Sequence, residues 1–412
     1  MDVPVKPTLT LNMPLLCYLS ILALVACQDP PNDRQPRPTD AASVSRLHQG
    51  PYAAAIEAAK RAVERDPNSA VAHRNLADAY TRDNKLTEAL AAYQQAIALQ
   101  PDYAKARTEL AIVLTRLNRH AEALALLEEV TRETPDYAWA QMALGLLYFR
   151  QAQYEQAVAA HGRAAALQDD YSEAWYNLGE AHLKLNDYAA AEAAYGRAIA
   201  ADSTVAKYHH GLGTALYKRR EYAAAIVELQ HAVDLDSLFA RARFNLGNAL
   251  LRSGQQEEGQ RQLALYNELE KQEKLLVGLR TTLIRTPDKA ELYHKIGALY
   301  GQRGQYEEAH LYYLQALDRN PNFAPSYHNL GNLYLRRRQV AEAMSLFRQA
   351  LRADSTYVLA HFALGNALMM QEAFAQALAS YERGLHFEPD NARLQRGAAL
   401  ARKFNAASQT KD

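Results

Sequence analysis

Residues 172–205 read SEAWYNLGEAHLKLNDYAAAEAAYGRAIAADSTV, and this stretch decides the fold. Its apolar and small residues fall three or four apart on both sides of Asn186 and Asp187, a pair that favours a turn. That spacing is typical of helices, and the pair interrupts it. The stretch therefore predicts two antiparallel helices joined by a tight turn.

The same pattern recurs along the chain with a fixed period. A leucine or isoleucine followed by a small residue returns every 34 residues, with one longer step, at Leu76, Leu110, Leu144, Leu178, Leu212, Leu246, Ile296, Leu330 and Leu364. A period of this size predicts a stacked repeat. The small residue lets the two helices of a repeat approach closely. A large residue there would overpack the crossing and lower the stability by about 1–3 kcal/mol.

This pattern resembles that of the tetratricopeptide repeat family. The family's preferred residues match Trp175, Leu178, Gly179, Ala191, Tyr195 and Ala198, whereas His182 and Ser203 depart from it. Nine repeats match over residues 70–391. The resemblance implies an all-α fold, a right-handed superhelical solenoid of about ten antiparallel helix pairs in two sub-arrays, closed by a C-terminal capping helix.

The longer step lies between Leu246 and Ile296. The apolar residues in it predict either one lengthened helix, from about Glu257 to Ile284, or a helix broken at Gly278 that adds a half-repeat. In both cases the stacking phase changes here. We therefore expect a first array at 46–273, an insertion at 274–289, a second array at 290–391, and a capping helix and tail at 392–412.

The amino terminus predicts export and a lipid anchor. Residues 1–26 contain a short apolar run that ends in small residues, as a secretory signal peptide does. Residues 24–27 read LVAC, which resembles a bacterial lipobox and would make Cys27 the lipid-modified residue. Residues 27–45, rich in proline, are expected to form a disordered tether. The alternative is an uncleaved N-terminal membrane anchor.

Composition and motifs argue against several functions. Lys+Arg and Asp+Glu are equal at 46 each, so a dominant nucleic-acid partner is not expected. The sequence shows no phosphate-binding loop and no catalytic motif, and we expect no enzyme activity, cofactor or metal ion. His210, His294 and His328 share one repeat position. Those of adjacent repeats should lie about 8–10 Å apart or more, too far for one metal ion.

The predicted partner-binding site is the concave groove lined by the first helix of each repeat, where family members bind peptides or helices of other proteins. An apolar and aromatic patch is expected there from Trp139, Met142, Leu146, Phe149, Tyr176 and Leu183. A second set of candidates has side-chain amides that can bond an extended peptide: Asn177, Asn245, Asn248, Asn329, Asn332 and Asn366. The alternatives are packing between helices for the first set and simple repeat consensus for the second.

Together these features predict a non-enzymatic scaffold that is tethered by lipid to a bacterial membrane. It would hold a protein or peptide partner during envelope assembly or export. Gln28, after the cysteine, favours the outer membrane by the sorting rule of lipoproteins, with the array in the periplasm. The alternative function is an accessory subunit of an envelope enzyme, such as a glycosyl-transfer or polysaccharide system.

Overall fold

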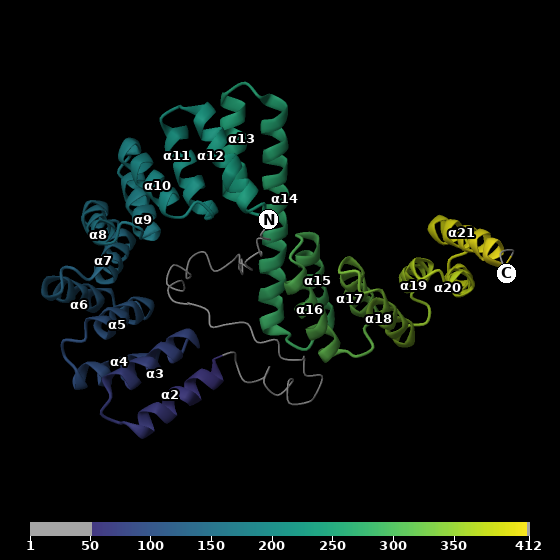
Figure 1. Ribbon diagram of the computed structural model, residues 1–412, viewed down its shortest axis with the longest axis horizontal. Helices are drawn as coiled ribbons and strands as arrows, with labels where there is room; N and C mark the ends of the chain where they lie inside the picture. The colour runs from purple at the N-terminus through teal and green to yellow at the C-terminus, as the bar shows by residue number, and fades with distance from the viewer. Residues whose placement is uncertain (1–51, 410–412) are drawn as a thin grey trace, which may run out of the picture. The chain divides into compact units, whose positions relative to one another are not determined.

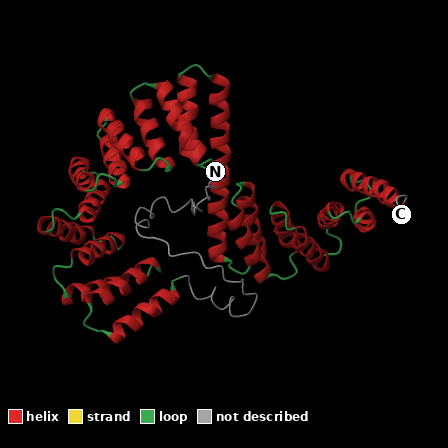
Figure 2. Cartoon of the chain, in the orientation of Figure 1, coloured by secondary structure: helices red, strands yellow, loops and turns green. Residues whose placement is uncertain are grey.

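The computed structural model describes residues 52–409, and every element in this part of the chain is a helix (Figures 1 and 2). The helices are α2 (Ala53–Arg65), α3 (Ala70–Arg82), α4 (Leu86–Leu99), α5 (Ala104–Arg116), α6 (His120–Glu133), α7 (Ala138–Arg150), α8 (Tyr154–Leu167), α9 (Ser172–Lys184), α10 (Tyr188–Ala201), α11 (Ala206–Lys218), α12 (Tyr222–Leu235), α13 (Ala240–Arg252), α14 (Gln256–Arg285), α15 (Ala290–Gln302), α16 (Tyr306–Arg319), α17 (Ala324–Arg336), α18 (Val340–Ala353), α19 (Val358–Met370), α20 (Phe374–Phe387) and α21 (Ala392–Gln409). Antiparallel pairs run from α3–α4 to α19–α20, which confirms the predicted all-α repeat architecture.

The signal peptide, Cys27 and the tether predicted from the sequence lie outside the described residues. Among residues 52–409, no helix is both long and apolar enough to cross a bilayer.

The turn inside each pair depends on one residue with left-handed backbone. This residue lies two positions after the first helix ends, at Asn84, Asn118, Ala152, Asn186, Arg220, Gly254, Gly304, Arg338 and Glu372. The next backbone N–H then bonds back into the helix, as Lys85 does to the carbonyl of Tyr80 at 2.9 Å. This is the Schellman type of helix end, at which glycine and asparagine are the usual residues.

Close helix crossings depend on small residues, as the period predicted, and around Tyr195 these residues are glycines. Tyr195 of α10 lies between Gly179 of α9 and Gly211 of α11. A Cβ at Gly179 would lie 2.7 Å from the ring carbon Cε1, and one at Gly211 would lie 2.5 Å from it. Both glycines therefore leave the volume that the buried tyrosine ring fills.

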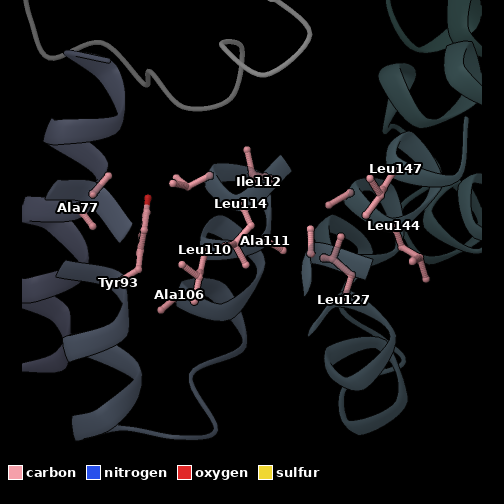
Figure 3. Packing of buried hydrophobic residues seen from close by; sticks show 14 of the residues in the cluster. Ala77, Tyr93, Ala106, Leu110, Ala111, Ile112, Leu114, Leu127, Leu144 and Leu147 are labelled. Atoms are coloured by element: carbon pink, nitrogen blue, oxygen red, sulfur yellow. The ribbon is translucent and has the colours of Figure 1, made fainter. Parts of the chain in front are cut away.

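The chain forms two compact modules, each described by itself. The N-terminal module comprises the described residues up to Ser237 together with Arg252–Gly254. Its largest core passes from repeat to repeat, from Ala77 and Tyr93 through Leu110 to Leu127 and Leu144 (Figure 3). Each layer thus buries apolar side chains against the next one, as a solenoid requires.

The C-terminal module comprises Leu238–Leu251 and the residues from Gln255 onward, and α14 is its longest helix. α14 runs unbroken through Gly278, so the longer step in the period is one lengthened helix. Its first turns pack on α13, where a Cβ at Gly247 would lie 3.0 Å from the carbonyl of Gly259. Farther along, Leu276 is buried with Ile296 of α15. The helix α14 thus packs on both α13 and α15, so the α13–α14 pair belongs to the C-terminal module. The boundary between the modules therefore precedes the insertion at 274–289 by one helix pair.

The last helix, α21, covers the final pair as a capping helix. Leu394, Ala398 and Ala401 on one face of α21 are buried in a common core with Tyr381 of α20. The helix α21 therefore takes the place that the first helix of a following repeat would occupy.

Candidate partner-binding surface

The first helices of neighbouring repeats contact one another as well as their own second helices. In the N-terminal module these contacts join α5 to α7, α7 to α9, and α9 to α11. We call the surface formed by the side chains of these four helices the first-helix face. A partner can reach the side chains of this face that are exposed to solvent.

Trp139, on α7, links two repeats on this face. It is half-buried, and its indole Nε1–H donates to Oε1 of Glu109 on α5, 3.1 Å away. Burial, and then the nearby carboxylate of Asp78, raise the pKa of Glu109. The indole is thus fixed in position by a carboxylate, with part of its ring exposed.

Met142 and Asn177 are more deeply buried than a binding surface requires. Met142 is only 2% exposed and packs with Ala174 of the next first helix. The amide of Asn177 is turned inward, donating to the carbonyl of Glu173 at 2.8 Å and to the sulfur of Met142 at 3.9 Å. These two residues connect α7 to α9. Leu146 packs on the same core and is partly buried.

Phe149 and Leu183 lie near the ends of α7 and α9. The Phe149 ring meets Tyr154 of α8 edge to face, with centroids 5.4 Å apart. Leu183 packs against the small core that contains Tyr195. Both side chains are partly exposed, so they extend the apolar character of this region toward the turns.

A group of aromatic and charged side chains on the first-helix face joins α9 to α11. The Tyr176 ring lies 5.3 Å from that of Tyr208 and 5.8 Å from that of Tyr195. The ammonium of Lys207 lies 4.9 Å from the Tyr176 ring centre and 2.8 Å from a carboxylate oxygen of Glu173. We call Glu173, Tyr176, Lys207 and Tyr208 the α9–α11 cluster. It presents a flat apolar ring beside an oriented ion pair.

Lys207 and Tyr208 are absent from the set predicted from the sequence. Tyr208 stands 34 residues after Ala174, at a position where most repeats carry alanine. It is 3% exposed, and its hydroxyl lies 3.1 Å from Oγ of Ser172. A large residue at a small-residue position was the signal that could have identified it.

The asparagines of the C-terminal module make contacts within the chain. The amide of Asn248 donates to the carbonyl of Phe244 at 2.9 Å, and the amide of Asn329 donates to the hydroxyl of Tyr313 at 3.3 Å. Oδ1 of Asn366 accepts from the hydroxyl of Tyr381 at 2.7 Å. Asn332 lies 3.4 Å from a ring nitrogen of His328, and Asn245 also interacts within the chain. Asn329 thus joins α17 to α16 and Asn366 joins α19 to α20, whereas Asn248 and Asn332 bond within their own helices. All of these asparagines lie in a different module from Trp139 and Tyr176.

His294 and His328 lie among aromatic rings. His294 has Tyr313 and Phe323 within 5.5 Å, centre to centre, and its Nδ1 lies 3.1 Å from Oγ of Ser326. Burial, followed by the charge of His328, lowers the pKa of His294 to about 4, and burial also lowers the pKa of His328. Both rings are therefore neutral near pH 7.

Models of the tetratricopeptide repeat match most of the sequence. The matched residues are 41–103, 81–147, 142–206, 210–269, 290–323, 312–344 and 334–402. No curated protein matches the sequence.

Several solved structures are similar in fold. A MamA structure from Desulfovibrio magneticus RS-1 shares 24% identity over 41% of this chain and 95% of its own, with a TM-score of 0.39. YrrB, described as a TPR protein with an unusual peptide-binding site, shares 19% identity over 57% of this chain and 95% of its own, with a TM-score of 0.29. TTC0263, a TPR protein of Thermus thermophilus, shares 20% identity over 44% of this chain and 100% of its own, with a TM-score of 0.37.

Proposed function

The chain belongs to the tetratricopeptide repeat family of protein-interaction scaffolds, and from this premise we propose that it holds a protein or peptide partner on its first-helix face. The proposed anchor point is the α9–α11 cluster, with Trp139 as a second contact. We further propose that a lipid on Cys27 tethers the array to a bacterial membrane, facing the periplasm, where it serves envelope assembly or export.

The observation that supports the partner site is the chemistry of the α9–α11 cluster. The Tyr176 ring is held by Tyr208 and Tyr195, so little side-chain entropy is lost when a partner packs on it. Aromatic residues that are fixed in this way, with charges at their rim, dominate the energetics of protein interfaces. The ion pair of Glu173 and Lys207 also gives the site a polar side. A segment with an apolar or aromatic side chain beside a polar group fits this arrangement.

Site-specific crosslinking tests the partner site. A photoreactive phenylalanine in place of Tyr176 should trap a partner protein in cells, and so should one in place of Trp139. The matched control is Val227, on the second helix α12 and 52% exposed. Efficient trapping from Val227, with none from Tyr176 or Trp139, would place the partner on the other side of the array. A trapped glycosyltransferase would favour the accessory-subunit function instead.

A substitution pair measures the energetic role of Tyr176 once the partner is in hand. Tyr176→Ala removes the ring and should weaken binding by about 2 kcal/mol or more, as truncation of an interface anchor does. Tyr176→Phe keeps the ring and should bind within about tenfold of the wild type. Equal binding by all three proteins would remove Tyr176 from the interface.

The lipid anchor rests on the sequence LVAC at 24–27 and the proline-rich segment that follows it. Metabolic labelling with a radioactive fatty acid should mark the wild-type chain and leave Cys27→Ser unlabelled. Equal labelling of the two chains, or none of either, would exclude this modification.

A further inference from the structure

A repeated hydrogen bond fixes the orientation of one histidine ring. The fourth residue of many first helices reaches back to the backbone carbonyl six residues earlier. The pairs are His73 with Pro67, Gln141 with Pro135, Trp175 with Asp169, His209 with Ser203, Tyr293 with Pro287, His361 with Ser355, and Gln395 with Pro389. A carbonyl oxygen only accepts, so the side chain must donate, as the indole of Trp175 and the amide of Gln395 do. His209 therefore carries a proton on Nε2, which lies 3.1 Å from the carbonyl of Ser203.

The other ring nitrogen of His209 faces a carboxylate. Nδ1 lies 2.8 Å from Oε2 of Glu228, on α12. With the proton on Nε2, a neutral ring has a lone pair on Nδ1, and this lone pair points at an oxygen that also only accepts. The two atoms are both satisfied when a proton or a metal cation lies between them.

A third ligand stands beside this pair. His231 follows Glu228 by three residues on the same face of α12, one turn along the helix. Its ring meets that of His209 edge to face, with centroids 5.5 Å apart. One ligand atom from each of the three residues can be chosen so that all three lie within 4.8 Å of one another.

We propose that His209, Glu228 and His231 bind a divalent transition-metal ion, with Zn²⁺ as the best fit. Two imidazoles and a carboxylate suit Zn²⁺ better than Mg²⁺ or Ca²⁺, which prefer oxygen. Tetrahedral ligands about 2.0–2.1 Å from Zn²⁺ lie about 3.3 Å from one another. His209 and Glu228 need only separate slightly, and the exposed His231 can turn inward. Water takes the fourth position.

His209 already makes the supporting hydrogen bond that zinc-binding histidines use. A ligating histidine normally donates its other ring N–H to a carbonyl or carboxylate, which fixes the ring and its tautomer. The bond from His209 to Ser203 does this. Because His209 lies on α11 and the other two ligands on α12, the ion would clamp the two helices of one repeat together (Figure 1).

Other repeats with a histidine at this position lack the partners. His361 makes the same backbone bond at 2.9 Å, but the residues that correspond to Glu228 and His231 are Ser380 and Arg383. The three ligands are therefore particular to the α11–α12 repeat, and His361 provides an internal control.

The test is calorimetric titration of the purified full-length chain with ZnCl₂. We expect one site per chain with a Kd of about 10 μM or tighter. His209→Gln keeps a donor for the Ser203 carbonyl, as Gln141 and Gln395 show in their own repeats, but loses the ligand nitrogen. This variant, Glu228→Gln and His231→Gln should each weaken binding about tenfold to a hundredfold or more, whereas His361→Gln should bind as the wild type does.

Because His231 is exposed, His231→Gln tests the site without disturbing the core. Circular dichroism checks that every variant is folded. A wild-type chain that does not bind Zn²⁺ tighter than about 100 μM overturns the proposal, and the contact of His209 with Glu228 is then a hydrogen bond without a metal ion. Zinc binding that is equal in all four variants also overturns it, because the ion then lies elsewhere.

Discussion

Gly397 of the last helix lies against the ring of Tyr381, so close that a Cβ on the glycine would lie 2.8 Å from the ring carbon Cε1. Gly211 bears the same relation to Tyr195 within the array. In both cases the glycine follows the tyrosine by 16 residues. The closing helix thus covers the final tyrosine with the same surface that an internal first helix offers to its neighbour.

Stability of the final repeat should depend on this helix. Leu394 is fully buried, so Leu394→Ala should lower the free energy of unfolding by about 2–5 kcal/mol, through lost burial and the cavity left behind. Leu400 on the same helix is 49% exposed, and Leu400→Ala is the matched control with an effect of about 0.5 kcal/mol or less. Urea denaturation followed by circular dichroism measures both. Similar losses in the two variants would contradict the capping role.

Gly179 should tolerate no side chain. In Gly179→Ala the new methyl group would meet the ring of Tyr195, which overpacks the crossing and costs about 1–3 kcal/mol. Gly196, on the second helix of the same repeat, has nothing within 4 Å of its Cβ position. Gly196→Ala should instead stabilise the protein by up to about 1 kcal/mol through helix propensity. Thermal unfolding distinguishes the two, and opposite signs are the expected result.

Tyrosine hydroxyls of the array form hydrogen bonds that a single substitution can remove or introduce. The hydroxyl of Tyr195 donates to Oε1 of Glu180 at 2.5 Å, and Tyr195→Phe should cost about 1.5–3 kcal/mol, because the acceptor is charged. Phe347 occupies the equivalent position, and Asn332 lies 15 residues before it, as Glu180 does before Tyr195. Phe347→Tyr should therefore be neutral or stabilising. A destabilised Phe347→Tyr would show that the position does not admit the bond.

His161 should be replaceable with a gain in stability. It fills the position of Tyr195 in its own repeat, and neither ring nitrogen has a hydrogen-bond partner. Leu229 fills the same position in the α11–α12 repeat and packs against Gly213, as His161 packs against Gly145. His161→Leu removes the unpaired polar atoms, so the free energy of unfolding should rise by about 1–3 kcal/mol at pH 7. An exposed control, His386→Leu, should have little effect.

The same substitution should change the response to acid. Burial lowers the pKa of His161 to about 3, from an ordinary value of 6.5. Between these values the unfolded chain takes up a proton that the folded chain refuses, so the free energy of unfolding falls as pH falls from 6.5 toward 3. His294 contributes in the same sense down to about pH 4. His161→Leu should therefore lose less stability on acidification than the wild type, measured by urea denaturation at about pH 7 and about pH 5. Parallel pH profiles would show that His161 takes up its proton in the folded state.

The sequence predicted the helix pairs well because the same apolar period is repeated many times. The helices α9 and α10 lie within residues 172–205, with the predicted turn at Asn186 between them. The lengthened helix was expected from about Glu257 to Ile284, and α14 extends from Gln256 to Arg285. The predicted ends of this helix differ from the observed ends by one residue each. The agreement is close because each apolar position has a counterpart in the next repeat.

The binding surface was harder to predict because exposure depends on the neighbouring repeat. Met142 and Tyr176 share one repeat position, yet Met142 is 2% exposed and Tyr176 is only partly buried. The next first helix places Ala174 beside Met142, which leaves room for burial, but it places Tyr208 beside Tyr176. The period gives the position of a side chain, whereas the size of the residue 32 positions later decides how deep it lies.

The asparagines and the proposed metal ligands show the same limit. An amide at a repeat position can face a partner or its own helix, and Asn177 faces inward because Met142 and the carbonyl of Glu173 are within reach. His209 and Glu228 are 19 residues apart and meet only because their helices are antiparallel neighbours. The repeat position of His210, the next residue in the sequence, gives no indication of this pair.

The left-handed turn residue of each repeat has a consequence for engineering. At Ala152, Arg220, Arg338 and Glu372 the backbone takes a conformation that costs such residues about 1 kcal/mol relative to glycine. Because a solenoid's stability is close to a sum over its repeats, glycine at these turns offers four separate adjustments of stability. None of the four residues belongs to the α9–α11 cluster or to the metal ligands. The array can therefore be stabilised step by step, one turn at a time, while its recognition chemistry is left unchanged.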